Sequence, residues 1–507
     1  MYSCPKCQNS RLRNKGIFYN KRENVNKQRF KCNECNFYFS IQAERSEEPY
    51  QTQKFDDKKI NENLHFNHKR YVITSQQKNT EINHEFYETL INYCGVNDAE
   101  LIVLGSDEIE IQNNNFNIGK YIKVYGNLNL SKTMENPLAG LDGLSKGYSL
   151  IVGHPVLQFK TLPVFGDNHP IIMTTTGTIS IPEYDITRKA GAKAEHNHSF
   201  SAIVLEVDKQ LDIFHIRVLN CDDNGAFYDL DGYYEGTHVS YGHRVDALVL
   251  GDEHWAEHDK DVYKATHSNH DSMVNILRPK TLVRHDSLSY LQASSHHVRN
   301  NFLARYRLHK TNNDDVLKEL LDTTEFIKKT TTKDIVNNIL VDSNHHSHLT
   351  QWLSQGNVQY DYKNAEIYHF LMYHTLKNIN EGGKADVSPF EFFFRSFVKD
   401  EEVNNKTTFL GNNDSYIING VELGLHGHVG INGAKGSPTG FSRLATKVIV
   451  GHSHSPSILK GSYTVGTSSE MKLSYTSGAS TWLQTHCIIH KNGRRQLVSI
   501  IKGKWRL

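Results

Sequence analysis

The segment Lys447–His454 constrains the fold of this chain more than any other stretch. It has the sequence Lys-Val-Ile-Val-Gly-His-Ser-His, in which the short β-branched run predicts a buried strand. Gly451 allows a sharp turn where the strand ends, and two histidines follow with one serine between them. Residues two apart in an extended segment point to the same side, so His452 and His454 can reach one metal site or two adjacent ones. A turn with two solvated histidines would give the same short pattern, so the choice between these two interpretations depends on the rest of the chain.

Composition limits what kind of protein this is. The 507 residues are too many for one ordinary domain, and we expect about two to four. The 57 basic and 56 acidic side chains nearly balance, so only local patches would attract nucleic acid. No apolar run is as long as a membrane span, and the first residues lack the apolar core of a signal peptide, so we expect a soluble, cytoplasmic protein. The 29 histidines are unusual, because histidine is the commonest metal ligand among side chains.

Residues 1–40 contain two Cys-x-x-Cys pairs, which predict a zinc ribbon. Cys4, Cys7, Cys32 and Cys35 supply the four thiolates of a closed tetrahedral site for one structural Zn²⁺. The alternative is a redox-active dithiol, which would need only one Cys-x-x-Cys pair. Nine Lys or Arg against two Glu give this segment a net charge of +7, with aromatic residues among them. In this respect it resembles the ribbons of transposases and other DNA-binding proteins; the alternative is a structural or protein-contact ribbon.

A linker and an accessory region are predicted to follow the ribbon. Residues 41–70 are polar and charged with almost no apolar periodicity, which is typical of a linker. A strand–helix–strand pattern over 71–105 predicts the start of an α/β layer, and residues from about 120 to 240 predict short strands broken by Gly, Pro and Asn. His196 and His198 could be ligands, but we prefer to place them on a polar β surface that lines or approaches the active site.

The pattern at residues 447–454 recurs at four earlier positions, where an apolar strand ends in residue types that bind metals. Helical stretches over Asp315–Lys329 and Asn364–Asn378 separate some of these strands. Open α/β sheets gather ligands at the carboxyl ends of their strands, so the five ends can build one cluster. A carboxylate between two ions can bridge them at about 3.5–4 Å. In chain order the residues at these ends are Asp252 and His254, Asp286, Asn344 and His345, His426, and His452 and His454.

The order Asp-x-His, Asp, Asn-His, His and Gly-His-x-His resembles the calcineurin-like metallophosphoesterase superfamily, which includes nucleases of double-strand-break repair. This resemblance covers roughly residues 241–460 and implies layered sheets flanked by helices. The chain also resembles tailed-bacteriophage proteins related to the early deoxyribonuclease that degrades host DNA. That narrower resemblance covers most of the chain from residue 71 and rests on the stretches 71–80, 97–103 and 426–437. For a phage-encoded protein it implies action in the host cytoplasm.

The superfamily pattern, carried onto the matching positions, implies a role for each residue. One metal would be held by Asp252, His254 and His454, and the second by Asn344, His426 and His452. Asp286 would bridge both ions, and His345 would lie beside the scissile phosphate as an acid or a charge stabiliser. Mixed imidazole and carboxylate ligands favour Mn²⁺, with Fe or Zn²⁺ as alternatives. Two divalent ions would neutralise the phosphodiester, activate the attacking water and stabilise the leaving oxygen.

Three positions depart from the family pattern. His285 replaces the usual glycine before the bridging aspartate, and His346 replaces the acid that usually follows Asn-His. His428 lies two residues from His426, which leaves open which of the two binds metal; we favour His426. Three further histidines are expected to support the ligands or face solvent: His296, His297 and His348.

Together these inferences predict a metal-dependent DNase. Its parts would be a zinc ribbon (1–40), a linker (41–70), an α/β and β-rich accessory region (71–240) and a metallophosphoesterase catalytic domain (241–507). One alternative is a phosphomonoesterase or small-molecule phosphodiesterase whose ribbon contacts protein. The other is a non-catalytic zinc-ribbon DNA-binding protein. The complete ligand set argues against the latter, and the basic ribbon favours DNA as the partner; the oligomeric state stays open.

Overall fold

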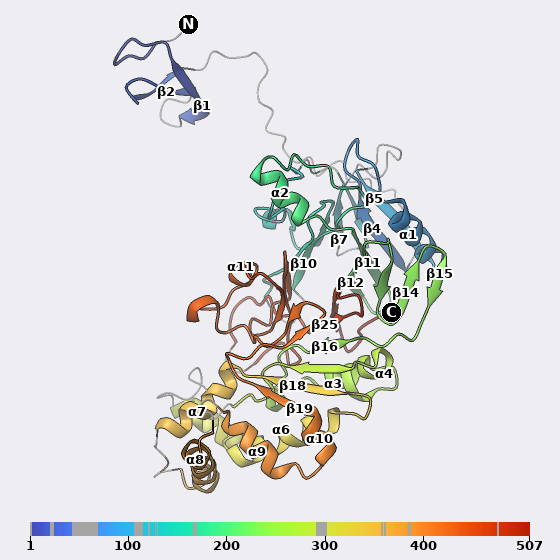
Figure 1. The fold of residues 1–507 in the computed structure, drawn as a ribbon, viewed down its shortest axis with the longest axis vertical. Helices are drawn as coiled ribbons and strands as arrows, with labels where there is room; N and C mark the ends of the chain where they lie inside the picture. Colours follow the sequence, from blue (N-terminus) through green and yellow to red (C-terminus); the bar gives the residue numbers. More distant parts are fainter. Residues whose placement is uncertain are drawn as a thin grey trace. The chain divides into compact units, whose positions relative to one another are not determined.

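The structure is a computed structural model, and the residues it describes are 3–20, 25–42, 69–105, 115–119, 122–126, 128, 130–165, 170–290, 302–355, 358, 361–383, 387–473 and 476–507. The chain forms two compact units, Met1–Lys59 and Ile60–Leu507 (Figure 1). Most of the predicted linker, and also His296 and His297, lie outside the described residues. Among the helices that are described, none is both long and apolar enough to cross a membrane.

The smaller unit contains a three-stranded antiparallel sheet. Its strands are β1 (Leu12–Asn20), β2 (Val25–Cys32) and β3 (Tyr38–Gln42), in that order. The rings of Phe30 and Phe39 stack across β2 and β3 with their centroids 5.8 Å apart. The cysteines lie at or beside two turns, one before β1 and one after β2, as the ribbon prediction requires.

The larger unit is a mixed α/β structure with several sheets, as predicted. Its widest sheet has the strand order β20-β21-β22-β24-β23-β9-β10-β8-β7-β6. The bounds of these strands are β6 (Asn115–Ile118), β7 (Ile122–Tyr125), β8 (Ser149–Val152), β9 (Gln158–Leu162), β10 (Ile171–Thr175), β20 (Ile417–Ile418), β21 (Val421–Glu422), β22 (Lys447–Val450), β23 (Ser457–Leu459) and β24 (Ser462–Thr464). Because β23 pairs with β9, the predicted accessory and catalytic regions share one sheet.

A six-stranded sheet has the order β19-β18-β17-β16-β25-β26. The four strands from β16 to β19 are parallel, and β25 runs antiparallel to β16. The bounds are β16 (Ala247–Val249), β17 (Thr281–Arg284), β18 (Asn337–Val341), β19 (Thr407–Leu410), β25 (Thr485–Ile489) and β26 (Arg495–Ser499).

Two smaller sheets complete the β structure. One has the order β12-β11-β4-β5, and the other is the meander β13-β14-β15. Their bounds are β4 (Arg70–Ser75), β5 (Ala99–Leu104), β11 (Ser201–Asp208), β12 (Ile213–Asn220), β13 (Phe227–Asp229), β14 (Gly232–Glu235) and β15 (His238–Ser240). The predicted strand–helix–strand start is confirmed as β4, α1 (His84–Val96) and β5, with β4 and β5 parallel.

Ten further helices lie among these sheets, in the described part of the chain. They are α2 (Lys189–His196), α3 (Lys260–Tyr263), α4 (Met273–Leu277), α5 (Phe302–Lys310), α6 (Val316–Thr330), α7 (Asn344–Gln355), α8 (Ala365–Asn380), α9 (Pro389–Phe397), α10 (Glu401–Lys406) and α11 (Pro438–Phe441). The helices predicted over Asp315–Lys329 and Asn364–Asn378 are confirmed as α6 and α8. Asp315 caps α6 because its side chain accepts a hydrogen bond from the Lys318 amide at 2.9 Å.

The main core lies between the sheets and fixes the strand ends. Val249, Val283 and Ile339 of the six-stranded sheet belong to the same buried cluster as Ile449 of β22 and Ile73 of β4. The alternate residues of these strands face helices, because side chains alternate along a strand. Leu248 and Leu282 pack with α3 and α4, and Leu340 packs with helices α6 to α9. Strands buried on both faces have little freedom to shift, so the residues at their ends are held firmly.

Candidate metal centre

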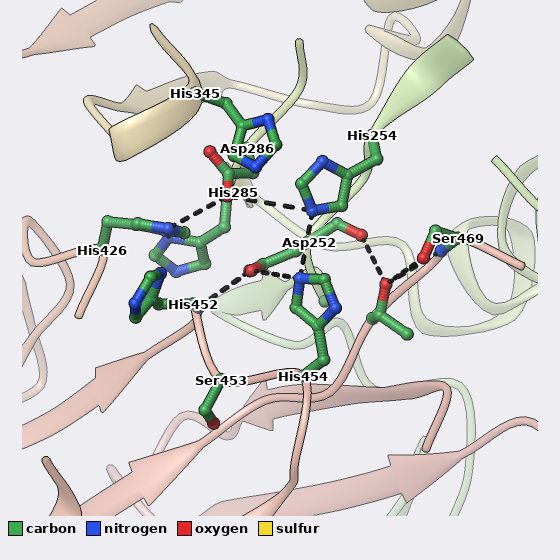
Figure 2. A network of polar contacts seen from close by, with 12 residues as sticks. Asp252, His254, His285, Asp286, His345, His426, His452, Ser453, His454 and Ser469 are labelled. Carbon is green, nitrogen blue, oxygen red and sulfur yellow. Dashed lines mark hydrogen bonds and ion pairs between the residues drawn. The ribbon is translucent and has the colours of Figure 1, made fainter. Parts of the chain in front are cut away.

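The five strand ends predicted from the sequence meet in one largely buried cluster, most of which Figure 2 shows. They belong to two sheets rather than to the single open sheet from which we argued. β16, β17 and β18 are parallel neighbours in the six-stranded sheet, and β21 and β22 are parallel neighbours in the ten-stranded sheet. The site is therefore assembled where the carboxyl ends of two sets of parallel strands face each other.

One half of the cluster consists of Asp252, His254 and His454. His454 Nε2 lies 3.1 Å from Asp252 Oδ2 and 3.0 Å from His254 Nε2. All three residues are buried, and one ligand atom from each lies within 4.8 Å of the others. The Trp482 ring packs edge-on against His454, with 4.2 Å between centroids. These three side chains could hold one metal ion.

Asp286 connects this half to a second one. Its Oδ2 lies 3.8 Å from His254 Nε2 and 3.1 Å from His426 Nε2. His426 Nε2 is also 3.2 Å from Asn344 Oδ1, and the same oxygen is 3.0 Å from His452 Nδ1. The atoms of Asn344, His426 and His452 thus converge on one side of Asp286, in the grouping that the family pattern implies for a second ion.

The histidines at the departures from the family pattern have different surroundings. His426 contacts Asp286, whereas His428 lies to one side, with its ring centroid 5.4 Å from that of His426. The geometry therefore favours His426 as the ligand. His285 Nδ1 lies 3.4 Å from His426 Nδ1, on the opposite edge of the ring from Asp286, so His285 supports this ring from behind. His346 Nδ1 faces Asp342 at 3.8 Å, outside the cluster.

His345 lies at the start of α7, immediately after Asn344. Its ring packs against His254 with 4.5 Å between centroids, and it groups with His254 and Asp286 as a third possible set of ligand atoms. Its Nδ1 faces the Ser289 carbonyl oxygen. His348, whose ring centroid is 5.2 Å away, is buried behind it rather than solvated.

The backbone at this cluster is unusual. Four of the candidate ligands have positive φ, a conformation that residues other than glycine rarely adopt. They are His254 (42°), Asp286 (45°), His452 (70°) and His454 (56°). Each such residue costs of order 1–3 kcal/mol and persists only where the surrounding structure holds it, which is common at functional sites.

Gly451 is required by the close packing below the cluster. A Cβ added there would lie 2.2 Å from Asp252 Oδ1 and 3.1 Å from His285 Cγ. The missing side chain also lets the His452 amide donate to Asp252 Oδ2 at 2.9 Å. The glycine that the sequence suggested for a turn therefore makes room for a carboxylate.

The electrostatics of the cluster favour a bound cation. Burial would raise the pKa of Asp252, but His426 and His454 lower it to about 2. Burial would lower the pKa of His426, but Asp286 and Asp252 raise it to about 9. Asp286 Oδ1 is buried and has no hydrogen-bond partner among the described residues. Two ionised carboxylates surrounded by imidazoles suit divalent metal ions, and the residues present fit such ions.

Several residues that support this cluster could not be predicted from the sequence. The Ser468 amide donates to the Asp252 carbonyl at 2.8 Å, and the Thr467 hydroxyl donates to the same oxygen at 3.1 Å. Glu253, between two candidate ligands, instead accepts from Arg284 Nη1 at 2.7 Å. Serines, threonines and a single Arg–Glu pair carry no spacing pattern, so only the three-dimensional arrangement reveals them.

The histidines predicted near residue 197 are not part of the cluster. His198 Nδ1 lies 2.8 Å from the Tyr184 hydroxyl, and His198 Nε2 lies 2.8 Å from the Ser180 carbonyl oxygen. His196 is exposed at the end of α2. This arrangement agrees with a polar surface rather than with metal binding.

The four cysteines of the smaller unit form a separate candidate site. The Sγ atoms of Cys4 and Cys35 are 3.5 Å apart, and so are those of Cys7 and Cys32. All four lie within 4.8 Å of one another, and the predicted tetrad could therefore bind one zinc ion.

The fold and these two sites define a mixed α/β protein with a buried histidine–aspartate centre and a cysteine tetrad. No protein-family profile matches the chain. No solved structure matches it either. Protein A1 of Escherichia phage T5 is 31% identical to it over 472 residues, which cover 86% of this chain and 83% of that protein. The chain belongs to the family of phage T5 protein A1, and the predicted link to bacteriophages is confirmed.

Proposed function

We propose that this protein is a metal-dependent phosphodiesterase of the metallophosphoesterase type that cleaves DNA. One observation carries the proposal: the seven predicted ligands come from five strand ends of two sheets, and the other six lie around Asp286. Bound there, two divalent ions would neutralise the phosphodiester, activate the attacking water and stabilise the leaving oxygen. Asp252, His254 and His454 would hold one ion, and Asn344, His426 and His452 the other.

His345 is the residue that we propose to act on the phosphate. Its Nδ1 faces the Ser289 carbonyl, and because a carbonyl oxygen only accepts, Nδ1 carries a proton. The nitrogen available to a substrate is then Nε2. From its position against His254 and Asp286, this nitrogen can donate a hydrogen bond or a proton to a phosphate oxygen once the ring is protonated.

The charge distribution supports DNA as the substrate. Residues 1–40 carry a net charge of +7 in a chain of net +1, so the remaining residues carry −6. Polyanion binding would therefore depend on the smaller unit, while the larger unit carries the candidate catalytic residues. Membership in a phage protein family agrees with a phage-related role.

The direct test is cleavage by the full chain after chelation and with Mn²⁺ added back. The substrates are linear, circular and single-stranded DNA, with bis-p-nitrophenyl phosphate and p-nitrophenyl phosphate alongside. We expect chelation to abolish cleavage and Mn²⁺ to restore it on DNA and on the diester. Full activity after exhaustive chelation would contradict the two-metal proposal, and activity on the monoester alone would favour a phosphomonoesterase.

A chain starting at Tyr71 tests the role of the ribbon. We expect it to bind DNA more weakly and with a shallower salt dependence, since each lost phosphate contact reduces the slope by roughly 0.9 on duplex DNA. Hydrolysis of bis-p-nitrophenyl phosphate should stay similar, because the ribbon belongs to a separate compact unit. Unchanged DNA affinity would instead favour a protein-contact ribbon.

A further inference from the structure

The larger unit contains a second cavity, lined by none of the candidate metal ligands, with a volume of about 720 Å³. Two of its basic residues come from α2, one from the start of β22, one from the turn between β23 and β24, and two from the residues at the start of β26. These residues are Lys189, Lys193, Lys447, Lys460, Arg494 and Arg495. The volume is within the range of small-molecule sites, roughly 300–1,000 Å³.

The positive charge of this cavity is only partly balanced. Glu135 is the one acidic residue of the lining, and it pairs with Lys193 and Lys460 at 2.6 Å each. Arg494 has a weak partner at 3.7 Å in Asp223, a fully exposed side chain. Lys447 has no carboxylate partner among the described residues, and the same holds for Arg495.

Arg495 is the strongest indication of a ligand. It is only 7% exposed, and its guanidinium lies over the Tyr463 ring at 3.8 Å. Its Nη1 donates to the carbonyls of Val448 and Gly461 at 3.1 and 2.8 Å. Its Nε and Nη2 make no hydrogen bond with the residues that the structure describes. These two donors are not among the buried unpartnered atoms, so they are open to a ligand, and an arginine fork matches the geometry of phosphate oxygens.

The cavity lies at the opposite end of β22 from the metal centre. Lys447 is the first residue of the strand and lines the cavity. Three buried residues follow it, and then come Gly451 and His452. Four residues of extended chain span roughly 13 Å. A phosphate bound beside Lys447 therefore does not reach the candidate metal ligands.

We propose that this cavity binds a mononucleotide-sized ligand through its phosphate. Lys447, Arg494 and Arg495 would hold the phosphate oxygens, because these three neighbouring positive charges have no close carboxylate partner in the described part of the chain. Apolar side chains of the same lining, among them Leu157, Leu444 and Ile458, would contact the nucleoside. The proposal is independent of the phosphodiesterase activity, since no candidate metal ligand takes part.

The test is isothermal titration calorimetry of the full chain with deoxyadenosine 5′-monophosphate, without added divalent metal. We expect binding of this nucleotide and none of deoxyadenosine. Lys447→Gln and Arg494→Gln should each weaken binding by roughly tenfold, the usual effect of losing a charged hydrogen bond. The matched control is Lys399→Gln, an exposed lysine after α9 that is not part of the cavity. All variants should unfold at the wild-type temperature, because the altered side chains are at the surface or half-buried.

Three results would overturn this proposal. The first is no binding by the wild-type chain at millimolar nucleotide. The second is a loss of binding in Asp286→Asn but not in Lys447→Gln, which would place the phosphate at the metal centre. The third is that binding of an oligothymidylate without a terminal phosphate depends on Lys447 and Arg494, while binding of the mononucleotide does not. That result would make the cavity a contact for a DNA strand.

Discussion

Two buried clusters of charged groups in the larger unit are compensated in opposite ways. In one, Arg217 lies between Glu206 and Asp229, and their side chains are 4%, 2% and 6% exposed. In the other, Asp252 and Asp286 are equally buried, but neither contacts a Lys or an Arg within the described part of the chain. In the first cluster the positive charge of Arg217 balances the carboxylates, whereas in the second the carboxylates contact imidazoles instead of a permanent cation.

The contacts of the Arg217 cluster show how complete the first kind of compensation is. Arg217 Nε lies 2.6 Å from Asp229 Oδ1, and Arg217 Nη1 lies 2.9 Å from Glu206 Oε2. Asp229 also accepts from the Tyr93 hydroxyl at 2.6 Å, and Glu206 pairs with Arg70 at 2.7 Å. Burial would raise the pKa of Asp229, but Arg217 lowers it. This cluster is a structural element that needs no ligand.

This contrast shows how a buried site that binds a cation can be recognised. Both clusters contain two buried carboxylates, so buried carboxylates are not diagnostic by themselves. What distinguishes the metal centre is the absence of a permanent positive charge, together with an unpartnered carboxylate oxygen on Asp286 and strained backbone at four candidate ligands. Substitutions in the two clusters test this difference.

His345→Asn should lower DNA cleavage by roughly 10²–10⁴-fold, the usual contribution of a general acid or base. The metal content of the purified protein should not change, because the proposed role of this side chain is toward the phosphate. Turnover is measured with saturating Mn²⁺, and bound metal by elemental analysis. If His345→Asn lost its metal while Asp286→Asn retained both ions, the two roles would have been assigned the wrong way round.

Arg217→Met should lower the free energy of unfolding by about 3–5 kcal/mol, because it leaves buried Asp229 without a cation and Glu206 with Arg70 alone. Denaturant unfolding in the presence of a chelator measures the effect. Asp286→Asn under the same conditions should cost clearly less, since the carboxylate that it removes is offset by imidazoles alone and not by a permanent cation. Equal destabilisation by both substitutions would mean that the two clusters do not differ as we describe.

Mn²⁺ should stabilise the wild-type chain by about 2.7 kcal/mol at one hundred times its dissociation constant. Asp286→Asn should lose most of this increment and His254→Asn less of it, because Asp286 contacts both halves of the centre. Arg217→Met should keep the full increment despite its lower starting stability. Thermal unfolding with and without Mn²⁺ provides the measurement.

The smallest expected effect is on acid stability. The folded-state pKa values of Glu206 and Asp229 are lowered beside Arg217, so their stabilisation is present above the unfolded-state pKa, about 4, and is lost as pH falls below it. In Arg217→Met this part of the pH dependence should flatten. Unfolding curves between about pH 5 and pH 2 test it, and an unchanged slope would argue against the assigned cause.

The candidate ligands were predictable because ligand-type residues directly follow apolar strands. The end of a buried strand is a fixed place, so Asp252, Asp286 and His452 could be grouped from chain order and residue type alone. The cysteine tetrad was predictable from spacing for the same reason. The helices α6 and α8 followed from their apolar periodicity.

Long-range pairing limited the rest of the prediction. That the strand ends belong to two sheets depends on pairings that leave no local signal. The Arg217 cluster draws on Tyr93 and Gln496, which lie far from each other in the chain. The positive φ angles at residues such as His454 could not be predicted either, because glycine is the residue type that indicates this conformation in a sequence.

The pairing of β23 with β9 has a consequence for the order of folding. The paired residues Leu459 and Gln158 are roughly 300 positions apart, and such contacts form late because a long loop must close first. Until then β9 has one unpaired edge, which is a template for association with other chains. Since β21 and β22 lie on the far side of that pairing, we expect the metal centre to be among the last parts to assemble. Pulse-labelled hydrogen exchange during refolding would then protect the β4 and β5 amides before those of β22.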